Sequence, residues 1–407
     1  MPDIRLAAGW TFAALVGGLV LGLLLAGTST ESAVLAVAQP VGSLWLAALQ
    51  MTIIPLVAAL LVTGVVRMIE TARAGAMARR TLLLIFGVLL AGGVLSVVAM
   101  PLLLALWIAP VEAGDLLVRD GAAPDVVPGL GDFVASLVAP NIFSAAADTQ
   151  MLPLIIFFAA LAVAITRLPK EQGELLTRLF AALGSAMLVI VGWVLFLAPV
   201  GVFALATGMA ARVGSDAIAT LGHYILTVSA MGFVIFLAAY VVAWLGAGIS
   251  LPRFARAILP AQAVALSTQS SLASLPPMLE SSRRLGIRAA TADFVLPLAV
   301  AIFRATSPAM NLAVVIYVAH IAGVALTPGL LAAGLAVALV TTVGSVSLPG
   351  SVSFVTSCAP IALTMGVPLE PLVLLVAVEM IPDLMRTVGN VTMDVALAGC
   401  VDKSDRD

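Results

Sequence analysis

The stretch around which this sequence is organised lies near its C-terminal end and reads Val378-Glu379-Met380-Ile381-Pro382-Asp383-Leu384-Met385-Arg386-Thr387-Val388-Gly389-Asn390-Val391-Thr392-Met393-Asp394. It lies inside an apolar segment that runs from about Leu372 to Val401, in a chain that is 62% hydrophobic and only 10% charged. If the segment is an α-helix, its polar side chains share an arc of about 80° on one face. They belong to Glu379, Asp383, Arg386, Asn390 and Asp394. A charge at membrane depth is costly unless it faces a partner or a polar cavity. The polar face therefore predicts a site for a ligand and an ion; the alternative is a self-neutralising cluster that holds helices together.

The overall composition indicates an integral membrane protein with many spans. The 407 residues have a mean hydropathy of +1.19 and include 34 glycines. The formal net charge is only −2, which argues against a nucleic acid as partner. Motifs for zinc proteases, phosphate-binding loops and dinucleotide binding are missing, and no nucleophile and base can be paired. The sequence therefore does not predict an enzyme or an ATP-driven pump, and we expect no cofactor and no dedicated metal site.

Apolar windows that could span a bilayer are separated by two segments of a different kind. The windows lie near residues 6–26, 42–66, 81–108, 151–166, 181–210, 218–248, 292–323 and 368–401. In the segments Arg253 to Glu280 and Pro328 to Met365, serine, glycine and proline interrupt an apolar run. Each predicts two half-helices joined by unwound chain, which is tolerated at membrane depth only where it is buried in protein or lines a cavity. A pair of such segments is typical of the binding site of a transporter.

The distribution of basic residues supports this arrangement. The arrangement considered has the N-terminus inside the cell, and each interrupted segment returns to its own side of the membrane. Most of the 19 lysines and arginines then face the cytoplasm, as the positive-inside rule requires. The acidic loop from Pro110 to Gln150 falls outside. The prediction is a multi-pass protein of the cell (inner) membrane with both termini in the cytoplasm.

Several motifs along the chain are similar to those of one transporter family. The most specific is the run from Asp383 to Asp394, which has the spacing D-x-x-R-T-x-x-N-V-x-x-D. Others are Gln50-Met51-Thr52-Ile53-Ile54-Pro55, Ala139-Pro140-Asn141-Ile142-Phe143, the serine-rich Ser270-Ser271-Leu272-Ala273-Ser274-Leu275-Pro276, Val295-Leu296-Pro297-Leu298 and Leu348-Pro349-Gly350. Essentially from end to end, the chain resembles the glutamate-transporter homologues, the dicarboxylate/amino acid:cation symporters.

The resemblance implies an all-α integral membrane fold with eight transmembrane helices and two re-entrant helical hairpins, built from inverted repeats and assembled as a homotrimer. Residues 1–80 (helices 1 and 2) and 111–217 (an outer loop with helices 4 and 5) would form the scaffold. Residues 81–110 (helix 3), 218–248 (helix 6) and 249–407 (both hairpins with helices 7 and 8) would form the mobile transport domain. The implied function is elevator-type symport of aspartate, glutamate or C4-type dicarboxylates.

The resemblance also implies roles for individual residues. Asp383 would hold a substrate amino group, and Arg386 a side-chain carboxylate, for which the planar guanidinium is well suited. Thr387 and Asn390 would hydrogen-bond the substrate, and Asp394 would bind a cation together with Asn390. The site would be closed by the two hairpin tips, which contain Ser270 and Ser271 in the first and Ser347, Pro349 and Gly350 in the second.

The pattern departs from the family on the seventh helix. Where the family carries Asn-Met-Asp-Gly-Thr, this chain reads Phe303-Arg304-Ala305-Thr306-Ser307. The third helix also offers no side-chain oxygen between Leu84 and Gly93. Sodium favours oxygen ligands, so we expect sodium coupling to be altered or lost, and the coupling ion can be Na⁺ or H⁺.

Three interpretations of Arg304 stay open. It pairs with Asp394 or Asp383 as a built-in cation, it is a second group that binds a carboxylate, or it reaches the lipid interface. Glu379 is a candidate proton site, because two carboxylates four residues apart on a helix repel when both are ionised. The alternative to a transporter is a non-transporting or regulatory membrane protein that keeps the fold; the intact motif from Asp383 to Asn390 favours transport.

Overall fold

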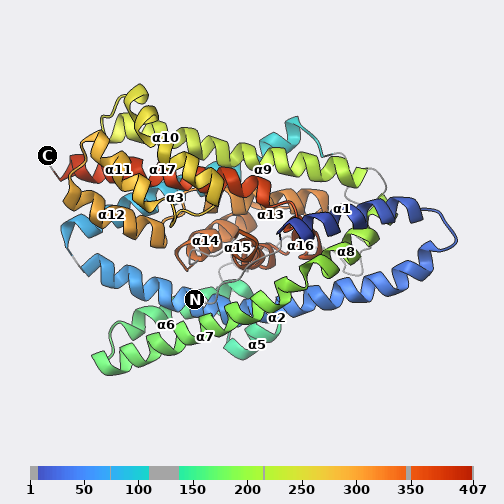
Figure 1. Cartoon of the computed structure of the whole chain (residues 1–407). Helices are drawn as coiled ribbons and strands as arrows, with labels where there is room; N and C mark the ends of the chain where they lie inside the picture. Colours follow the sequence, from blue (N-terminus) through green and yellow to red (C-terminus); the bar gives the residue numbers. More distant parts are fainter. Residues whose placement is uncertain (1–7, 74, 110–136, 214–215, 345–349, 406–407) are drawn as a thin grey trace.

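The computed structural model describes residues 8–73, 75–109, 137–213, 216–344 and 350–405 (Figure 1). Over these ranges the chain forms helices and turns and no strand. In the N-terminal half the helices are α1 (Ala8–Leu25), α2 (Glu31–Arg73), α3 (Ala76–Leu106), α5 (Ile142–Ala147), α6 (Met151–Ile165), α7 (Lys170–Phe196) and α8 (Ala198–Val213). They are followed by α9 (Asp216–Val241), the π-helical turn η1 (Val242–Gly246), α10 (Leu251–Thr268), α11 (Leu275–Leu285), α12 (Ala289–Ile302), α13 (Ser307–Ile321), α14 (Pro328–Gly344), α15 (Gly350–Thr364), α16 (Glu370–Leu375) and α17 (Met380–Ser404).

The described helices have the apolar character that the composition predicts. Five of the helical segments within those ranges are long and apolar enough to cross a membrane, and shorter apolar helices accompany them. The all-helical fold is therefore confirmed. The number of spans and the re-entrant placement of the hairpins stay predictions.

One group of helices is built around α2, which packs against α6, α7 and α8, while α1 lies along α8. Figure 1 shows α2, α6 and α7 along the lower edge of the molecule, with α1 and α8 at the right. The close approach of α1 to α8 depends on glycine: a Cβ added at Gly22 would lie 2.5 Å from the carbonyl oxygen of Thr207. The Trp45 indole donates to the Val194 carbonyl, 2.8 Å away, and fastens α2 to α7.

A second group surrounds α17, which packs against α9, α10 and α12. The C-terminal end of α17 is held by Arg288, whose Nε donates to Asp402 Oδ1 at 2.7 Å, and by Thr291, whose hydroxyl donates to the same oxygen at 2.9 Å. In Figure 1, α9, α10 and α17 run along the upper edge, and α13 to α16 lie between the two groups. This packing buries almost the whole length of α17 and places its polar face inside the protein.

Three windows that look continuous in the sequence are broken in the structure. The window 181–210 contains α7 and α8, which meet at Leu197, and 292–323 contains α12 and α13, which are separated by residues 303–306. Both breaks precede a proline, Pro199 or Pro308, in the first turn of the following helix. Proline lacks a backbone N–H and its ring clashes with the carbonyl four residues earlier, so an uninterrupted helix is disfavoured at both points.

The third broken window, 368–401, contains α16 and α17 with a turn at residues 376–379 between them. A single uninterrupted helix from about Leu372 is therefore not formed. Glu379 is the N-cap residue of α17, and its carbonyl accepts the first helical hydrogen bond, from the Asp383 N–H at 2.9 Å. Pro382 lies in the first turn of α17, where a missing N–H costs nothing. Glu379 therefore begins the polar face of α17, at the point where the turn meets the helix.

The two interrupted segments do form pairs of helices. The first consists of α10 and α11, which pack against each other and are joined through residues 269–274, with Gln269 in the left-handed region at φ 51°. The second consists of α14 and α15, which also pack together. Residues 345–349 between them lie outside the described residues.

Candidate functional site

The polar face of α17 is centred on Arg386, whose guanidinium nitrogens each face an acceptor. Nη2 donates to Glu379 Oε1 at 2.7 Å, Nη1 donates to Asn311 Oδ1 at 2.7 Å, and Nε lies 3.4 Å from Asp383 Oδ1. All four side chains are buried. Ionic groups of this kind are tolerated away from water only when pairing and hydrogen bonds are nearly complete, and here they are.

Glu379 is the most completely held acid of the cluster. Its second oxygen, Oε2, accepts a hydrogen bond from the Tyr224 hydroxyl on α9 at 2.9 Å. Tyr224 is fully buried and Glu379 is 1% exposed. Both Tyr224 and Asn311 were missed by sequence reasoning. Asn311 had one usable signal, since it is the single polar side chain between Ala309 and Ile316, whereas nothing in the sequence pairs Tyr224 with Glu379.

Asn390 joins the face of α17 to the break between α12 and α13. Its Oδ1 accepts from both the backbone N–H and the hydroxyl of Thr306, each at 2.9 Å. The Thr306 N–H lies at the start of α13, where a helix leaves its first N–H groups without an internal partner. Since the oxygen of Asn390 is used within the fold, its amide nitrogen is the group of this side chain that remains to donate to a further acceptor. Thr387, the next residue after Arg386, is buried as well.

Asp394 lies about two turns beyond Arg386 along α17 and is isolated. It is fully buried, and neither carboxylate oxygen has a hydrogen-bond partner among the residues that the structure describes. A buried, unpaired carboxylate is strongly disfavoured in its charged form, so Asp394 needs a proton or a cation. In the described part of the chain, no group of three or more His, Cys, Asp or Glu residues could hold a metal ion.

Arg304 lies in the unwound residues between α12 and α13 and is partly buried. It is within Coulombic range of Asp383 and Arg386. It does not hydrogen-bond Asp394, because neither Asp394 oxygen accepts a hydrogen bond within the described residues. Of the two acids considered as its partner, Asp394 therefore forms no hydrogen bond with Arg304.

The tip of the first helical pair reaches the start of α17. Ser270 and Ser271 are partly buried in the turn between α10 and α11, and the Ser274 hydroxyl donates to the Ser270 carbonyl at 2.9 Å. The Gln269 side chain donates to the Met380 carbonyl at 3.4 Å. The structure thus brings this tip next to the cluster. Of the expected residues of the second tip, Gly350 begins α15, while Ser347 and Pro349 lie outside the described residues.

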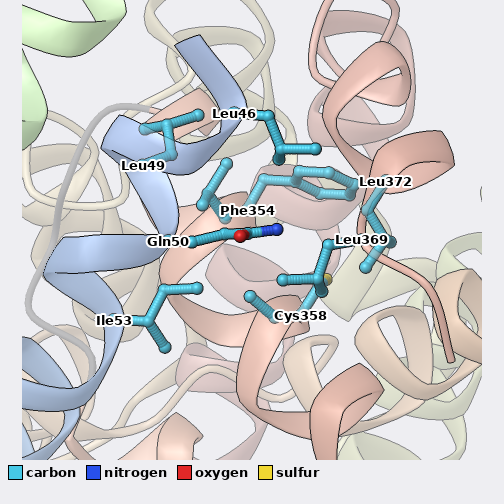
Figure 2. Close-up of a pocket in the computed structure, with 10 residues that line it drawn as sticks. Leu46, Leu49, Gln50, Ile53, Phe354, Cys358, Leu369 and Leu372 are labelled. Carbon is cyan, nitrogen blue, oxygen red and sulfur yellow. The ribbon is translucent and has the colours of Figure 1, made fainter. Parts of the chain in front are cut away.

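A separate, apolar hollow lies between α2 and α15 (Figure 2). It is lined by Leu46, Leu49, Gln50, Ile53, Phe354, Val355, Cys358, Ala359, Leu369 and Leu372. Gln50 is the one strongly polar side chain in this lining, so the hollow is unsuited to an anionic ligand. It marks a loosely packed part of the seam between the α2 group and the central helices.

Residues 8–404 match the model of the Sodium:dicarboxylate symporter family. The chain is 27% identical over 425 residues to the "Proton/glutamate-aspartate symporter" of Escherichia coli (strain K12), covering 100% of this chain and 95% of that protein. It is 26% identical over 393 residues to the "Proton/sodium-glutamate symport protein" of Bacillus caldotenax, covering 95% and 92%. The "C4-dicarboxylate transport protein 1" of Pseudomonas paraeruginosa (strain DSM 24068 / PA7) is 29% identical over 296 residues, covering 70% and 65%.

Proposed function

The chain belongs to the sodium:dicarboxylate symporter family, and from this premise we propose that it is a secondary active transporter of acidic amino acids or C4 dicarboxylates. The observation that carries the proposal is the buried guanidinium of Arg386, held between Glu379, Asp383 and Asn311 on the motif-bearing helix. The family and the apolar helices imply a multi-pass protein of the inner membrane. The relatives carry glutamate, aspartate or C4 dicarboxylates by their names.

Each end of the substrate has a matching group in the cluster. Arg386 binds a carboxylate through parallel N–H donors, a geometry that lysine lacks. Asp383 pairs with an ammonium in the case of aspartate or glutamate. A plain dicarboxylate has no ammonium, but Arg304 is within Coulombic range of Asp383 and can compensate it. Asn390 and Thr387 hydrogen-bond the remaining carboxylate, and Ser270 and Ser271 close the site from the first hairpin.

The coupling ion follows from the charges of the cluster. Arg304 and Arg386 balance Glu379 and Asp383 when no substrate is present. An acidic amino acid adds one net negative charge, which a buried site tolerates only with one further cation. Phe303 and Ala305 supply no side-chain oxygen for sodium, so we assign this role to a proton on Glu379. Asp394 is a second acid that can take a proton or a cation.

The proposed movement is of the elevator type. Residues 81–110, 218–248 and 249–407 form the moving part, residues 1–80 and 111–217 the scaffold, and a homotrimer holds the scaffolds together. Where α2 meets α14 and α15, the lining of the hollow in Figure 2 is almost entirely apolar. Apolar contact is not directional, so such a seam can slide without breaking hydrogen bonds.

Uptake into proteoliposomes tests the proposal. Labelled aspartate, glutamate and succinate would be offered while a sodium gradient and a proton gradient are imposed separately. We expect accumulation with an inward proton gradient when choline replaces sodium. If none of the three substrates accumulates under either gradient and none binds to the purified protein, the chain is a non-transporting member of its family and the proposal fails.

A further inference from the structure

Asn311 combines a satisfied oxygen with an unsatisfied nitrogen. Its side chain lies on α13, is fully buried, and receives the Arg386 Nη1 hydrogen bond on Oδ1 at 2.7 Å. Because a guanidinium only donates, the amide oxygen must face Arg386, and this fixes the orientation of the whole amide. The Nδ2 group is thereby directed elsewhere, and it has no hydrogen-bond partner within the described ranges.

A buried donor without an acceptor is uncommon, because it has lost water and gained nothing in return. The other unpartnered buried side-chain atoms of the described chain are the hydroxyls of Ser96, Ser229 and Ser282 and the carboxylate of Asp394. A hydroxyl can rotate its single hydrogen toward a weak acceptor, whereas the two N–H groups of an amide are fixed by the plane of the side chain. Asn311 therefore has two donors beside Arg386 that await an acceptor.

In this structure each of the three guanidinium nitrogens of Arg386 already faces an acceptor. Its acceptors are Glu379, Asp383 and Asn311. A carboxylate that binds two of these nitrogens in parallel takes the place of one of the acceptors. Glu379 is the one that can leave, because it lies at the N-terminal cap of α17 and keeps its hydrogen bond from Tyr224 when it releases Arg386. Asp383 lies within α17 and is also within Coulombic range of a second guanidinium, that of Arg304.

We propose that Asn311 is a specificity-determining residue that recognises the distal carboxylate of the substrate. Nδ2 of Asn311 donates to one carboxylate oxygen and Arg386 donates to the other, at the position that Glu379 occupies in this structure. Glu379 then takes up one proton from solution and stays on Tyr224. This inference rests on the proposed function and adds to it a residue that the family motif does not include.

The competing explanation is that Asn311 only holds Arg386 in place. Two variants separate the explanations. Asn311→Asp keeps the shape and an acceptor for Arg386 but removes the N–H donors, so a purely positioning role is preserved. Asn311→Leu removes both functions at similar volume. As a control, Gln262→Leu removes another buried amide, whose Nε2 donates to Thr392 and Tyr240 and does not contact Arg386.

The experiment measures the affinity of the full-length, purified protein for aspartate against asparagine and for succinate against its monoamide, succinamate. The acid-to-amide affinity ratio should fall at least about tenfold in Asn311→Asp and in Asn311→Leu, because a hydrogen bond to a charged group is lost. In Asn311→Asp the affinity for asparagine and for succinamate should increase, since the new carboxylate accepts a hydrogen bond from the NH₂ group of these ligands. Gln262→Leu should leave the ratio unchanged.

Two results would overturn the inference, and they are distinguishable. If the unmodified protein binds aspartate or succinate but Asn311→Asp keeps the same acid-to-amide ratio, Asn311 only positions Arg386 and the proposed function stands. If the unmodified protein binds none of the acids, the proposed function and this inference fail together.

Discussion

Replacing Glu379 with glutamine should make substrate binding nearly independent of pH. Glu379 is 1% exposed and accepts from Arg386 at 2.7 Å and from Tyr224 at 2.9 Å. Glutamine has the same shape, its amide oxygen can accept from Arg386, and its NH₂ group can donate to the tyrosine oxygen. The variant should therefore fold, while the acid that takes up the proton is gone.

The size of the effect follows from the charges around Arg386. In the free protein, Arg304 and Arg386 compensate Glu379 and Asp383. A substrate carboxylate on Arg386 is a third buried acid, so Glu379 binds one proton whenever substrate binds. If one proton is taken up per binding event, the dissociation constant rises about tenfold for each unit increase in pH, which is about 1.4 kcal/mol of binding free energy. This holds over the pH range in which Glu379 is ionised in the free protein. Because the proton is taken up on binding, affinity is full at low pH and is lost as the pH rises.

Isothermal titration of the purified protein with aspartate, from mildly acidic to mildly alkaline pH, measures this slope. Repeating the titration in buffers with different heats of ionisation counts the protons directly. Glu379→Gln should show a slope near zero and take up no proton. Glu280→Gln is the matched control, because Glu280 is an exposed acid on α11 that pairs with Arg283 and Arg284; the slope of the unmodified protein should persist there.

Two outcomes contradict this reasoning. A slope that stays near tenfold per pH unit in Glu379→Gln would move the proton to another acid, of which the unpartnered Asp394 is the first candidate. A pH-independent affinity in the unmodified protein that rises steeply with sodium concentration would show that sodium supplies the missing charge.

Three further predictions concern neighbouring parts of the structure. Arg386→Lys should weaken the binding of aspartate and of succinate at least about tenfold in the same titration, since a bidentate charged contact contributes about 1.5–3 kcal/mol. An unchanged affinity would remove Arg386 from the site. Asp383→Asn should weaken the binding of aspartate and leave the binding of succinate unchanged or tighter. An equal loss of affinity for both would mean that Asp383 acts on the fold or the coupling ion. Gly22→Ala should lower the free energy of unfolding by about 1–3 kcal/mol, because its Cβ would lie 2.5 Å from the Thr207 carbonyl oxygen. Gly17→Ala, with its nearest atom 3.6 Å away, should change thermal unfolding little, and equal losses would refute the steric argument.

Local chemistry made much of the fold predictable. The composition indicated a helical membrane protein, and serine, glycine and proline located both interrupted segments. Proline also explains the breaks that were not anticipated, before Pro199 and Pro308, since its effect is confined to the preceding turn. The signal was present, but an apolar window averages over a single residue and hides it.

The candidate site was predictable only along α17. Asp383, Arg386, Asn390 and Asp394 recur at helical spacing, so their common face is a consequence of the helix itself. The partners of these side chains on other helices could not be predicted from this spacing. Tyr224 is 155 residues from Glu379, and Asn311 is 75 residues from Arg386.

By itself, the sequence determined which side chains are charged, that they share one helix face, and that the chain around them is apolar. Only the tertiary structure decided how these charges combine: Glu379 caps α17 and binds Arg386, Arg304 lies near Asp383 and does not hydrogen-bond Asp394, and the Asn311 amide nitrogen has no acceptor within the described residues. The reason is that helical periodicity relates residues within a turn or two. The pairing of buried charges depends on separations between helices, and in a medium of low dielectric constant the interaction energy falls steeply over a few ångströms.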